Sequence, residues 1–188
     1  MTKQAVQWFT AAAHPWRQAV LNLLWPEFCR VCGVHLLTAE NGYFCPACWE
    51  RSPAIRRPYC THCGRPHPEM RGLGALENYP CADCRKQPPP HIGRIRGAAR
   101  YEGAVADAVK LLKFHGKVRL AGALAARMGE FAATEVDVET YDALVPVPLH
   151  RVRQRARGFN QSSLIARELL ESFPNAVLDE RLQRIRPT

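Results

Sequence analysis

The chain has 188 residues, of which 47% are hydrophobic, so it can form one ordinary domain or two small ones and is not expected to be disordered. Its 26 Lys and Arg residues outnumber its 17 Asp and Glu residues, for a net charge of +9. This excess favours anionic partners such as phosphates, nucleic acid or an acidic protein surface. No apolar run approaches the length of a membrane span, and no segment is typical of a secretion signal, so we expect a cytoplasmic protein.

Apolar residues recur at intervals of three and four between Val6 and Leu23. This spacing predicts an amphipathic N-terminal helix over residues 1–23. Such a helix usually packs against its own protein. Binding to a membrane surface is the alternative, and it is disfavoured because the polar face has few basic residues.

The eight cysteines form four Cys-x-x-Cys pairs, which are Cys29/Cys32, Cys45/Cys48, Cys60/Cys63 and Cys81/Cys84. Two thiolates three positions apart on a tight turn can face one metal ion, and two such pairs supply the four sulfur ligands of a closed zinc site. Gly33 and Gly64 follow two of the pairs, where the turn needs a residue that tolerates positive φ. We therefore predict two structural Zn²⁺ ions that hold the fold and take no part in chemistry.

The spacing leaves the ligation pattern open. Sequential use of the pairs is the simpler arrangement, with the first two pairs in one site and the last two in the other, but a cross-braced arrangement also fits. Disulfides are an alternative that the absence of a secretion signal disfavours. An iron–sulfur cluster is a second alternative.

We expect the cysteine-containing part to span residues 24–86 and a Pro-rich linker to span residues 87–91, because consecutive prolines favour an extended conformation. Candidate strands are residues 94–101, 143–148 and 176–178, and candidate helices are residues 105–112, 120–128 and 162–173. The strand at 143–148 is expected to be buried and to leave its sheet at a proline. This alternation predicts an α/β domain over residues 92–188, with a parallel sheet and flanking helices.

The segment from Val145 to Gln161 runs from the expected end of a strand to the start of a helix, where open parallel sheets bind ligands. Arginines alternate from 151 to 157, and no acidic residue lies between Asp142 and Glu168. Guanidinium groups match phosphate oxygens in pairs, so the segment predicts a phosphate site. A solvated basic surface, or unselective contact with nucleic-acid backbone, is the alternative. The candidate ligand-binding residues are Lys113, Arg155, Arg157, Gly158, Asn160 and Gln161.

Several motifs stand out together along the chain. They are Cys29-Arg30-Val31-Cys32-Gly33 with the later cysteine pairs, Tyr101-Glu102-Gly103, Leu112-Lys113-Phe114-His115-Gly116, Val145-Pro146-Val147-Pro148-Leu149-His150 and Arg157-Gly158-Phe159-Asn160-Gln161. From Leu24 onward the chain resembles the ComF family of competence-associated proteins, including the GntX group. The resemblance implies a double zinc ribbon, then a type I phosphoribosyltransferase-like domain. It also implies a link to DNA uptake in natural competence and ligands such as phosphoribosyl pyrophosphate.

The sequence departs from the family pattern in one respect. Phosphoribosyltransferase-like domains have paired aspartates and a Thr-Thr-Gly-type loop that holds the ribose and 5′-phosphate of the donor, and this sequence contains no such run. We therefore expect a C-terminally shortened member whose second domain is incomplete. The sequence leaves open whether the protein is an enzyme with phosphoribosyltransferase (glycosyltransferase) activity.

The expected function is binding of a phosphorylated sugar or nucleotide ligand, in association with DNA uptake. The alternative is a DNA-binding accessory or a zinc-dependent protein-interaction module without enzymatic activity. Its partners would be single-stranded DNA or proteins of the competence machinery. No aromatic residues alternate with the arginines, and this disfavours single-strand binding, because such binders stack bases on aromatic rings.

Overall fold

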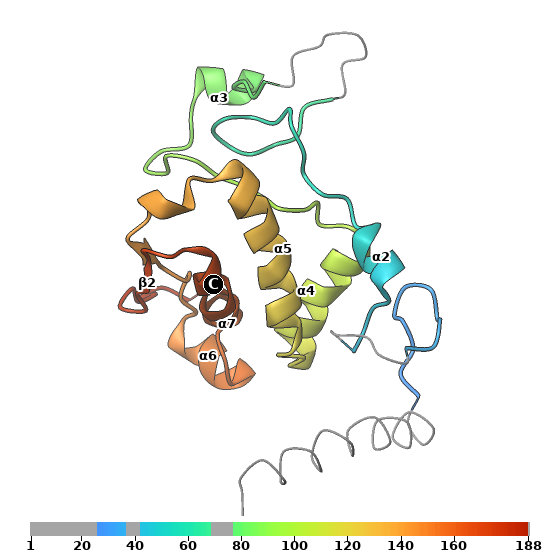
Figure 1. Cartoon of the computed structure of the whole chain (residues 1–188). Coiled ribbons are helices and arrows are strands. Elements are labelled where there is room, and N and C mark those ends of the chain that lie inside the picture. Colours follow the sequence, from blue (N-terminus) through green and yellow to red (C-terminus); the bar gives the residue numbers. More distant parts are fainter. Residues whose placement is uncertain (1–25, 37–41, 69–76, 188) are drawn as a thin grey trace, which may run out of the picture. The chain divides into compact units, whose positions relative to one another are not determined.

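The computed structural model describes residues 26–36, 42–68 and 77–187 (Figure 1). The chain divides into two compact units, residues 1–51 and residues 52–188. The predicted helix over residues 1–23 lies outside the described residues, and the predicted four-part division of the chain stays a prediction. Among the described residues, no helix has both the length and the apolar character needed to cross a bilayer.

The described part of the first unit, residues 26–36 and 42–51, contains a tight turn and a short helix. In the turn, the Cys29 amide donates to the Val34 carbonyl and the Gly33 amide donates to the Cys29 carbonyl, each at 2.8 Å. Helix α2 (Pro46–Glu50) begins with a proline, whose missing N–H is not needed at the first helical position. The buried cluster of this unit consists of Leu36 and two cysteines. In the described part of the unit, the large apolar side chains that are buried are Leu36 and Phe44.

The second unit repeats this local plan around Cys60, and helix α3 (Ala82–Lys86) begins directly after Cys81 and contains Cys84. The Cys60 amide donates to the Arg65 carbonyl at 2.8 Å, and the Gly64 amide donates to the Cys60 carbonyl at 3.0 Å. Gly64 has φ of 69°, and a Cβ there would lie 2.6 Å from the Ile95 carbonyl oxygen. Glycine is therefore required by both conformation and space. Gly33 also has positive φ, at 72°, which confirms the prediction for both glycines.

Three helices make up the body of the second unit. They are α4 (Gly103–His115), α5 (Leu120–Glu135) and α7 (Gln161–Leu169), and α5 packs against both of the others (Figure 1). Helix α4 ends at Gly116, whose φ of 64° is left-handed, and this break separates α4 from α5. The buried cluster between α5 and α7 combines small residues of α5 with Leu169 and Phe173. Small side chains on α5 allow α7 to approach closely.

The strands of the second unit are short and parallel. Strand β1 (Ala143–Leu144) pairs with β2 (Val177–Leu178), and a crossover containing α6 (Arg151–Arg157) and α7 connects them. The 3₁₀ turns η1 (Val138–Thr140) and η2 (Leu170–Ser172) follow α5 and α7. The predicted α/β class, with a parallel sheet and flanking helices, is confirmed. Both strands point their carboxyl ends toward the same edge.

Two of the strand predictions need correction. Residues 94–101 form no regular strand and make only an isolated bridge, at Ala99, because their amides reach separate partners along the cysteine-containing segment. Strand β1 stops at Leu144, and Val145 and Val147 are 50% and 65% exposed rather than buried. The alternating prolines that follow β1 have no N–H with which to extend a ladder.

A charged contact ties the second cysteine cluster to helix α5. Glu135, the last residue of α5, accepts hydrogen bonds from Arg57 Nε at 2.9 Å and from the Tyr59 hydroxyl. Tyr59 is buried and directly precedes Cys60. Burial, and then the hydrogen bond to Glu135, raises the pKa of Tyr59, so its hydroxyl keeps its proton. These contacts join the cysteine turn to the end of α5.

We expect Glu135→Ala to lower the free energy of unfolding by about 1–3 kcal/mol, because it leaves the buried Tyr59 hydroxyl without its acceptor. Denaturant unfolding of the zinc-loaded chain measures this change. Glu130→Ala is the matched control, since Glu130 is an exposed residue of the same helix. It should shift stability by less than about 0.5 kcal/mol. Equal effects of the two substitutions would contradict the proposed role of the contact.

Candidate metal centres and ligand pocket

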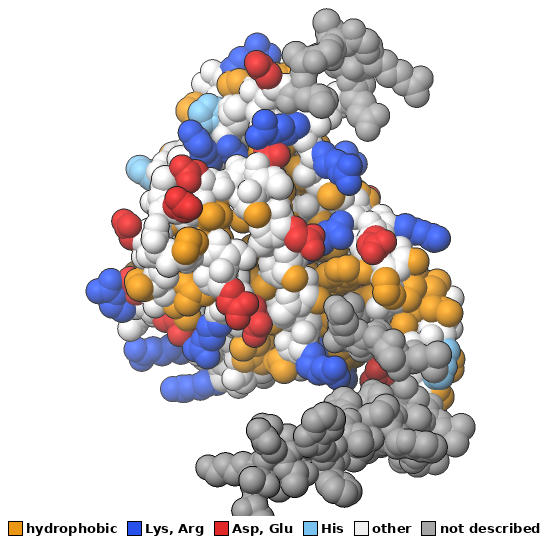
Figure 2. Space-filling model, viewed as in Figure 1, with side chains coloured by type: hydrophobic (Ala, Val, Ile, Leu, Met, Phe, Trp, Pro, Cys, Tyr) orange, Lys and Arg blue, Asp and Glu red, His pale blue; other side chains and the backbone are white. Residues whose placement is uncertain are grey.

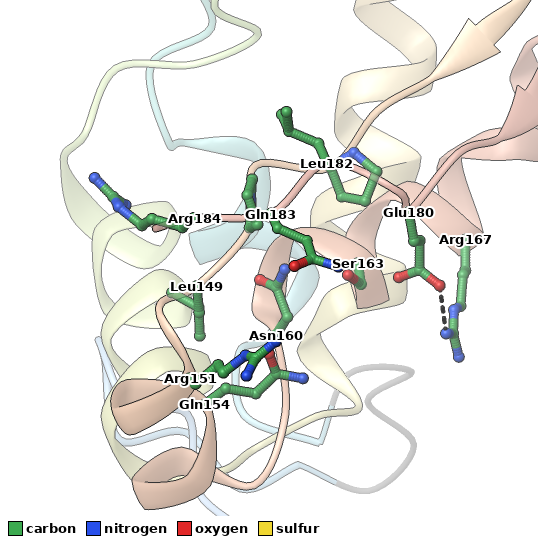
Figure 3. Close-up of a pocket in the computed structure, with 12 residues that line it drawn as sticks. Leu149, Arg151, Gln154, Asn160, Ser163, Arg167, Glu180, Leu182, Gln183 and Arg184 are labelled. Carbon is green, nitrogen blue, oxygen red and sulfur yellow. Dashed lines mark hydrogen bonds and ion pairs between the residues drawn. The ribbon is translucent and has the colours of Figure 1, made fainter. Parts of the chain in front are cut away.

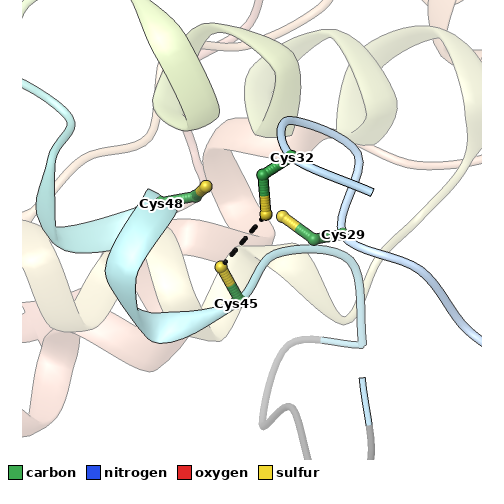
Figure 4. A group of neighbouring side chains, drawn as sticks. All are labelled: Cys29, Cys32, Cys45 and Cys48. Carbon is green, nitrogen blue, oxygen red and sulfur yellow. Dashed lines mark hydrogen bonds between the residues drawn. The ribbon is translucent and has the colours of Figure 1, made fainter. Parts of the chain in front are cut away.

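Four sulfur atoms converge in the first unit. Those of Cys29, Cys32, Cys45 and Cys48 all lie within 4.8 Å of one another (Figure 4). The Cys32 and Cys45 sulfurs are 3.7 Å apart, which is far longer than a disulfide bond of about 2 Å. Zinc–sulfur bonds of about 2.3 Å would place tetrahedral ligands about 3.8 Å apart. The cluster therefore has the dimensions of a four-sulfur zinc site.

The second unit contains an equivalent cluster of Cys60, Cys63, Cys81 and Cys84, whose sulfurs also lie within 4.8 Å of one another. The Cys63 and Cys81 sulfurs are 3.9 Å apart. Each site uses two consecutive pairs, so the geometry has the sequential arrangement rather than the cross-braced one. In both sites the first pair lies on a turn and the second pair flanks the start of a short helix.

Local electrostatics favour a cation in both clusters. Burial alone would raise the pKa of Cys29 and Cys60, but backbone N–H groups donate to their sulfurs and lower the pKa values to about 6 and about 5. Hydrogen bonds with Cys32 and then Cys45, together with burial, raise the pKa of Cys48 to about 12. Burial and hydrogen bonds to neighbouring sulfurs raise the pKa of Cys84 to about 12. Full ionisation of each cluster therefore needs a positive charge at its centre.

We expect acidification to release zinc in two steps, with the first cluster losing its ion at the higher pH. Protons compete with zinc for thiolates, and Cys32 of the first cluster is exposed, whereas each cysteine of the second cluster is buried or half-buried. Protons reach an exposed ligand more readily, so the second cluster should hold its ion longer. Native mass spectrometry across a descending pH series can count the bound ions.

A Cys45→Ser variant provides the matched control for this assignment. It should bind no zinc in the first cluster, and it should release zinc from the second cluster at the same pH as the second release step of the wild type. Release of both ions in one step, or earlier release from the second cluster, would contradict the expected order.

A pocket of about 430 Å³ lies in the second unit, where the chain leaves β1 and β2 (Figure 3). Asn160 shapes it by capping α7: its side-chain oxygen accepts from the Ser162 amide at 3.0 Å, and its amide donates to the Val147 carbonyl at 3.1 Å. These bonds fix the start of α7 against the segment that follows β1. The pocket is therefore positioned by the ends of both strands and the start of a helix.

The side chains lining this pocket leave an excess of positive charge. Arg167 donates to Glu180 at 2.9 Å, and hydrogen bonds from Ser163 and then from Arg167 lower the pKa of Glu180, which keeps it ionised at neutral pH. Arg151 and Arg184 also line the pocket and have no acidic partner among the described residues. On the face shown in Figure 2, several Lys and Arg side chains gather where α6 and β2 lie. The pocket can therefore receive an anion.

Only Asn160, of the six ligand-binding residues predicted from the sequence, lines this pocket. Arg155 is exposed on α6, and Gly158 ends that helix with φ of 84°. Lys113 lies in the last turn of α4. The phosphate-binding role of these residues stays a prediction.

Arg157 and Gln161 form a separate group. The Arg157 guanidinium donates to the Gln161 side chain and lies over the ring of Phe114, 5.9 Å from its centroid. The structure thus joins the predicted Arg157–Gln161 motif to the end of α4, and not to the pocket.

Sequence reasoning missed most of the polar residues that line the pocket. The alternation of arginines predicts a loop over residues 151–157, but these residues form a helix in which positions three apart, such as Arg151 and Gln154, share a face. Helical spacing was therefore a usable signal for these two residues. The sequence has no local signal for Arg184, which reaches the pocket through the path of the segment after β2.

Comparison with known proteins supports the assignment of the two cysteine clusters as zinc sites. A family model described as a double zinc ribbon domain matches residues 20–85. The chain is 30% identical over 168 residues to the DNA utilization protein YhgH of Salmonella typhimurium, covering 87% of this chain and 69% of that protein. It is 26% identical to competence protein F of Haemophilus influenzae, over 85% of this chain and 66% of that protein. It is 27% identical to competence protein ComFC of Bacillus subtilis, over 65% of this chain and 49% of that protein.

No solved structure matches the chain. The double zinc ribbon match and the two sulfur clusters together confirm the prediction of two structural zinc ions. With these motifs, clusters and relatives, the chain belongs to the ComF family of double-zinc-ribbon proteins.

Proposed function

We propose that this protein binds a phosphorylated sugar or nucleotide in the pocket at the carboxyl ends of β1 and β2, and that it acts in the utilization or uptake of DNA. The proposed role in DNA utilization or uptake is supported by relatives that are named a DNA utilization protein and competence proteins. The proposal concerns binding and includes no chemical step. The zinc ions support the fold, because a closed four-sulfur shell has no position open to a substrate.

The pair of unneutralised arginines at the strand ends is the main observation in favour of a phosphate ligand. Open parallel sheets bind ligands beyond the carboxyl ends of their strands. Arg151 lines the pocket from the start of α6, and Arg184 lines it from the segment after β2. A guanidinium can donate two parallel hydrogen bonds to one phosphate. The volume of about 430 Å³ is within the range of roughly 300–1,000 Å³ that is usual for small-molecule sites.

The opposite part of the lining favours a sugar attached to that phosphate. The ionised Glu180 carboxylate can only accept hydrogen bonds, and sugar hydroxyls are suitable donors. Ser163 and Asn160 add neutral polar groups to the same pocket. Because Arg167 holds Glu180 at 2.9 Å, the carboxylate is oriented before a ligand arrives. A phosphorylated sugar can therefore use both the arginines and the carboxylate.

Isothermal titration of the zinc-loaded chain with phosphoribosyl pyrophosphate, ribose 5-phosphate and inorganic phosphate tests the proposal. We expect saturable binding, with the two sugar phosphates preferred over inorganic phosphate. Arg151→Ala and Arg184→Ala should each weaken binding about 10-fold or more, because each removes charge-assisted hydrogen bonds worth roughly 1.5–3 kcal/mol. Arg85→Ala, in the exposed last turn of α3, is the matched control and should bind as the wild type does.

Glu180→Gln distinguishes the contribution of the sugar hydroxyls to binding from that of the phosphate. It should weaken the sugar phosphates and leave inorganic phosphate unchanged or slightly stronger. Absence of saturable binding for every phosphorylated compound would refute the pocket as a ligand site. Equal losses in Arg85→Ala and Arg151→Ala would show that only net charge matters.

A further inference from the structure

We propose that a single-stranded nucleic acid binds at the surface formed by the C-terminal turn of α4 and one face of α6, with a base stacked on the ring of Phe114. We call this surface the Phe114 face and define it by Lys113, Phe114, Arg153 and Arg157. It shares no residue with the pocket. The inference rests on the proposed role in DNA utilization and names a partner and a site for that role.

Phe114 is the first reason for this assignment. Its side chain is 72% exposed although it lies on a helix that is otherwise well packed through Val105, Ala108 and Leu112. The ring therefore contributes little to the core. The Arg157 guanidinium lies over it at 5.9 Å from the centroid, and an exposed fraction this large leaves ring surface open to a second flat partner. A nucleobase suits such a position because every base has a π-face.

Arg157 is held in place and still has donors to offer. Its side chain donates one hydrogen bond to Gln161, at the start of α7. A guanidinium has five N–H donors, so most of them remain for phosphate oxygens. The bond to Gln161 and the contact with Phe114 together fix the guanidinium beside the ring. A phosphate next to a stacked base would therefore meet an oriented cation.

Two further cations lie on the helices that carry this site. Arg153 lies four residues before Arg157 on α6, and positions four apart share a helix face. Lys113 is adjacent to Phe114 in the last turn of α4. Neither Arg153 nor Lys113 has an acidic partner among the described residues, in contrast to Lys110, which pairs with Asp107 at 3.1 Å.

Single-stranded nucleic acid fits this face better than a duplex or an acidic peptide does. Cations beside helix C-termini can simply balance the helix dipole, but this role does not explain the exposed ring. In a duplex, the bases stack on one another and cannot reach Phe114 without unpairing. An acidic peptide would use the cations and leave the ring unused. Proteins that bind single strands without sequence preference combine basic grooves with aromatic stacking.

The test uses the full, zinc-loaded chain and a fluorescein-labelled oligothymidylate of about 20 nucleotides, longer than the roughly 4–16 that one single-strand-binding fold covers. Fluorescence anisotropy at several salt concentrations gives the affinity and its salt dependence. We expect the single strand to bind more tightly than a duplex of the same length. Phe114→Ala should weaken binding about 10-fold with an unchanged salt slope, whereas Phe114→Trp should retain it.

Arg153→Ala and Arg157→Ala should weaken binding and each lower the salt slope by about one, because each removes one phosphate contact. Tyr101→Ala is the matched aromatic control, since Tyr101 is 62% exposed just before the start of α4. It should bind as the wild type does. Thermal unfolding of every variant should match the wild type, because all these side chains except the partly buried Arg157 are exposed. If Arg157→Ala unfolds at a lower temperature than the other variants, Arg157→Lys is used in its place. Because lysine keeps the charge, Arg157→Lys should keep the salt slope of the wild type.

Unchanged affinity in Phe114→Ala would overturn the stacking site, and so would equal binding of duplex and single strand. Binding of polyglutamate that depends equally on Phe114 would assign the face to an acidic protein partner instead. The pocket is tested separately, because Phe114→Ala should leave titration with ribose 5-phosphate unchanged. Sugar phosphate binding without oligonucleotide binding would refute this inference alone, and the reverse result would refute only the pocket.

Discussion

The mutual approach of four sulfur atoms is the constraint on which both cysteine-containing parts depend. The buried cluster of the first unit is Leu36 with cysteines, and the corresponding cluster of the second consists of cysteines alone. Outside these clusters, Phe44 and Tyr59 are the large side chains buried in the described cysteine-containing parts, and so few of them offset only part of the conformational entropy lost on folding. Metal binding must therefore supply much of the folding free energy. In the second unit the effect reaches further, because Tyr59, next to Cys60, is bonded to Glu135 at the end of α5.

The functional surfaces of the second unit arise at the ends of its elements. Prolines end β1 early and direct the chain outward, so that the segments after β1 and β2 enclose a pocket with α6 and α7. Gly158 then separates α6 from α7, and Arg157, just before it, turns toward α4. One crossover thus serves two surfaces. The proposed sugar phosphate site uses the start of α6, and the proposed nucleic-acid site uses its end.

Local patterns allowed the sequence to predict the two zinc sites, the positive φ of Gly33 and Gly64, and the parallel α/β class. These features depend on residues close together in the chain. The pocket could not be predicted in this way, because Arg184 reaches it through a long-range path. The sequence argument against single-strand binding counted only aromatics between the arginines. The structure instead brings Phe114 to Arg157 from a distant helix. Residues 94–101 failed as a strand because their amides bond to separate partners.

The number of zinc ions in freshly purified protein tests the central claim most directly. Native mass spectrometry before and after chelation gives the number of bound zinc ions. Thiol counting under denaturing conditions shows whether the cysteines are free or joined in disulfides. We expect two zinc ions in each chain and, after their removal, eight free thiols and a loss of ordered structure in both sulfur-containing turns. A chain that contains no zinc and whose cysteines are joined in disulfides would contradict the claim.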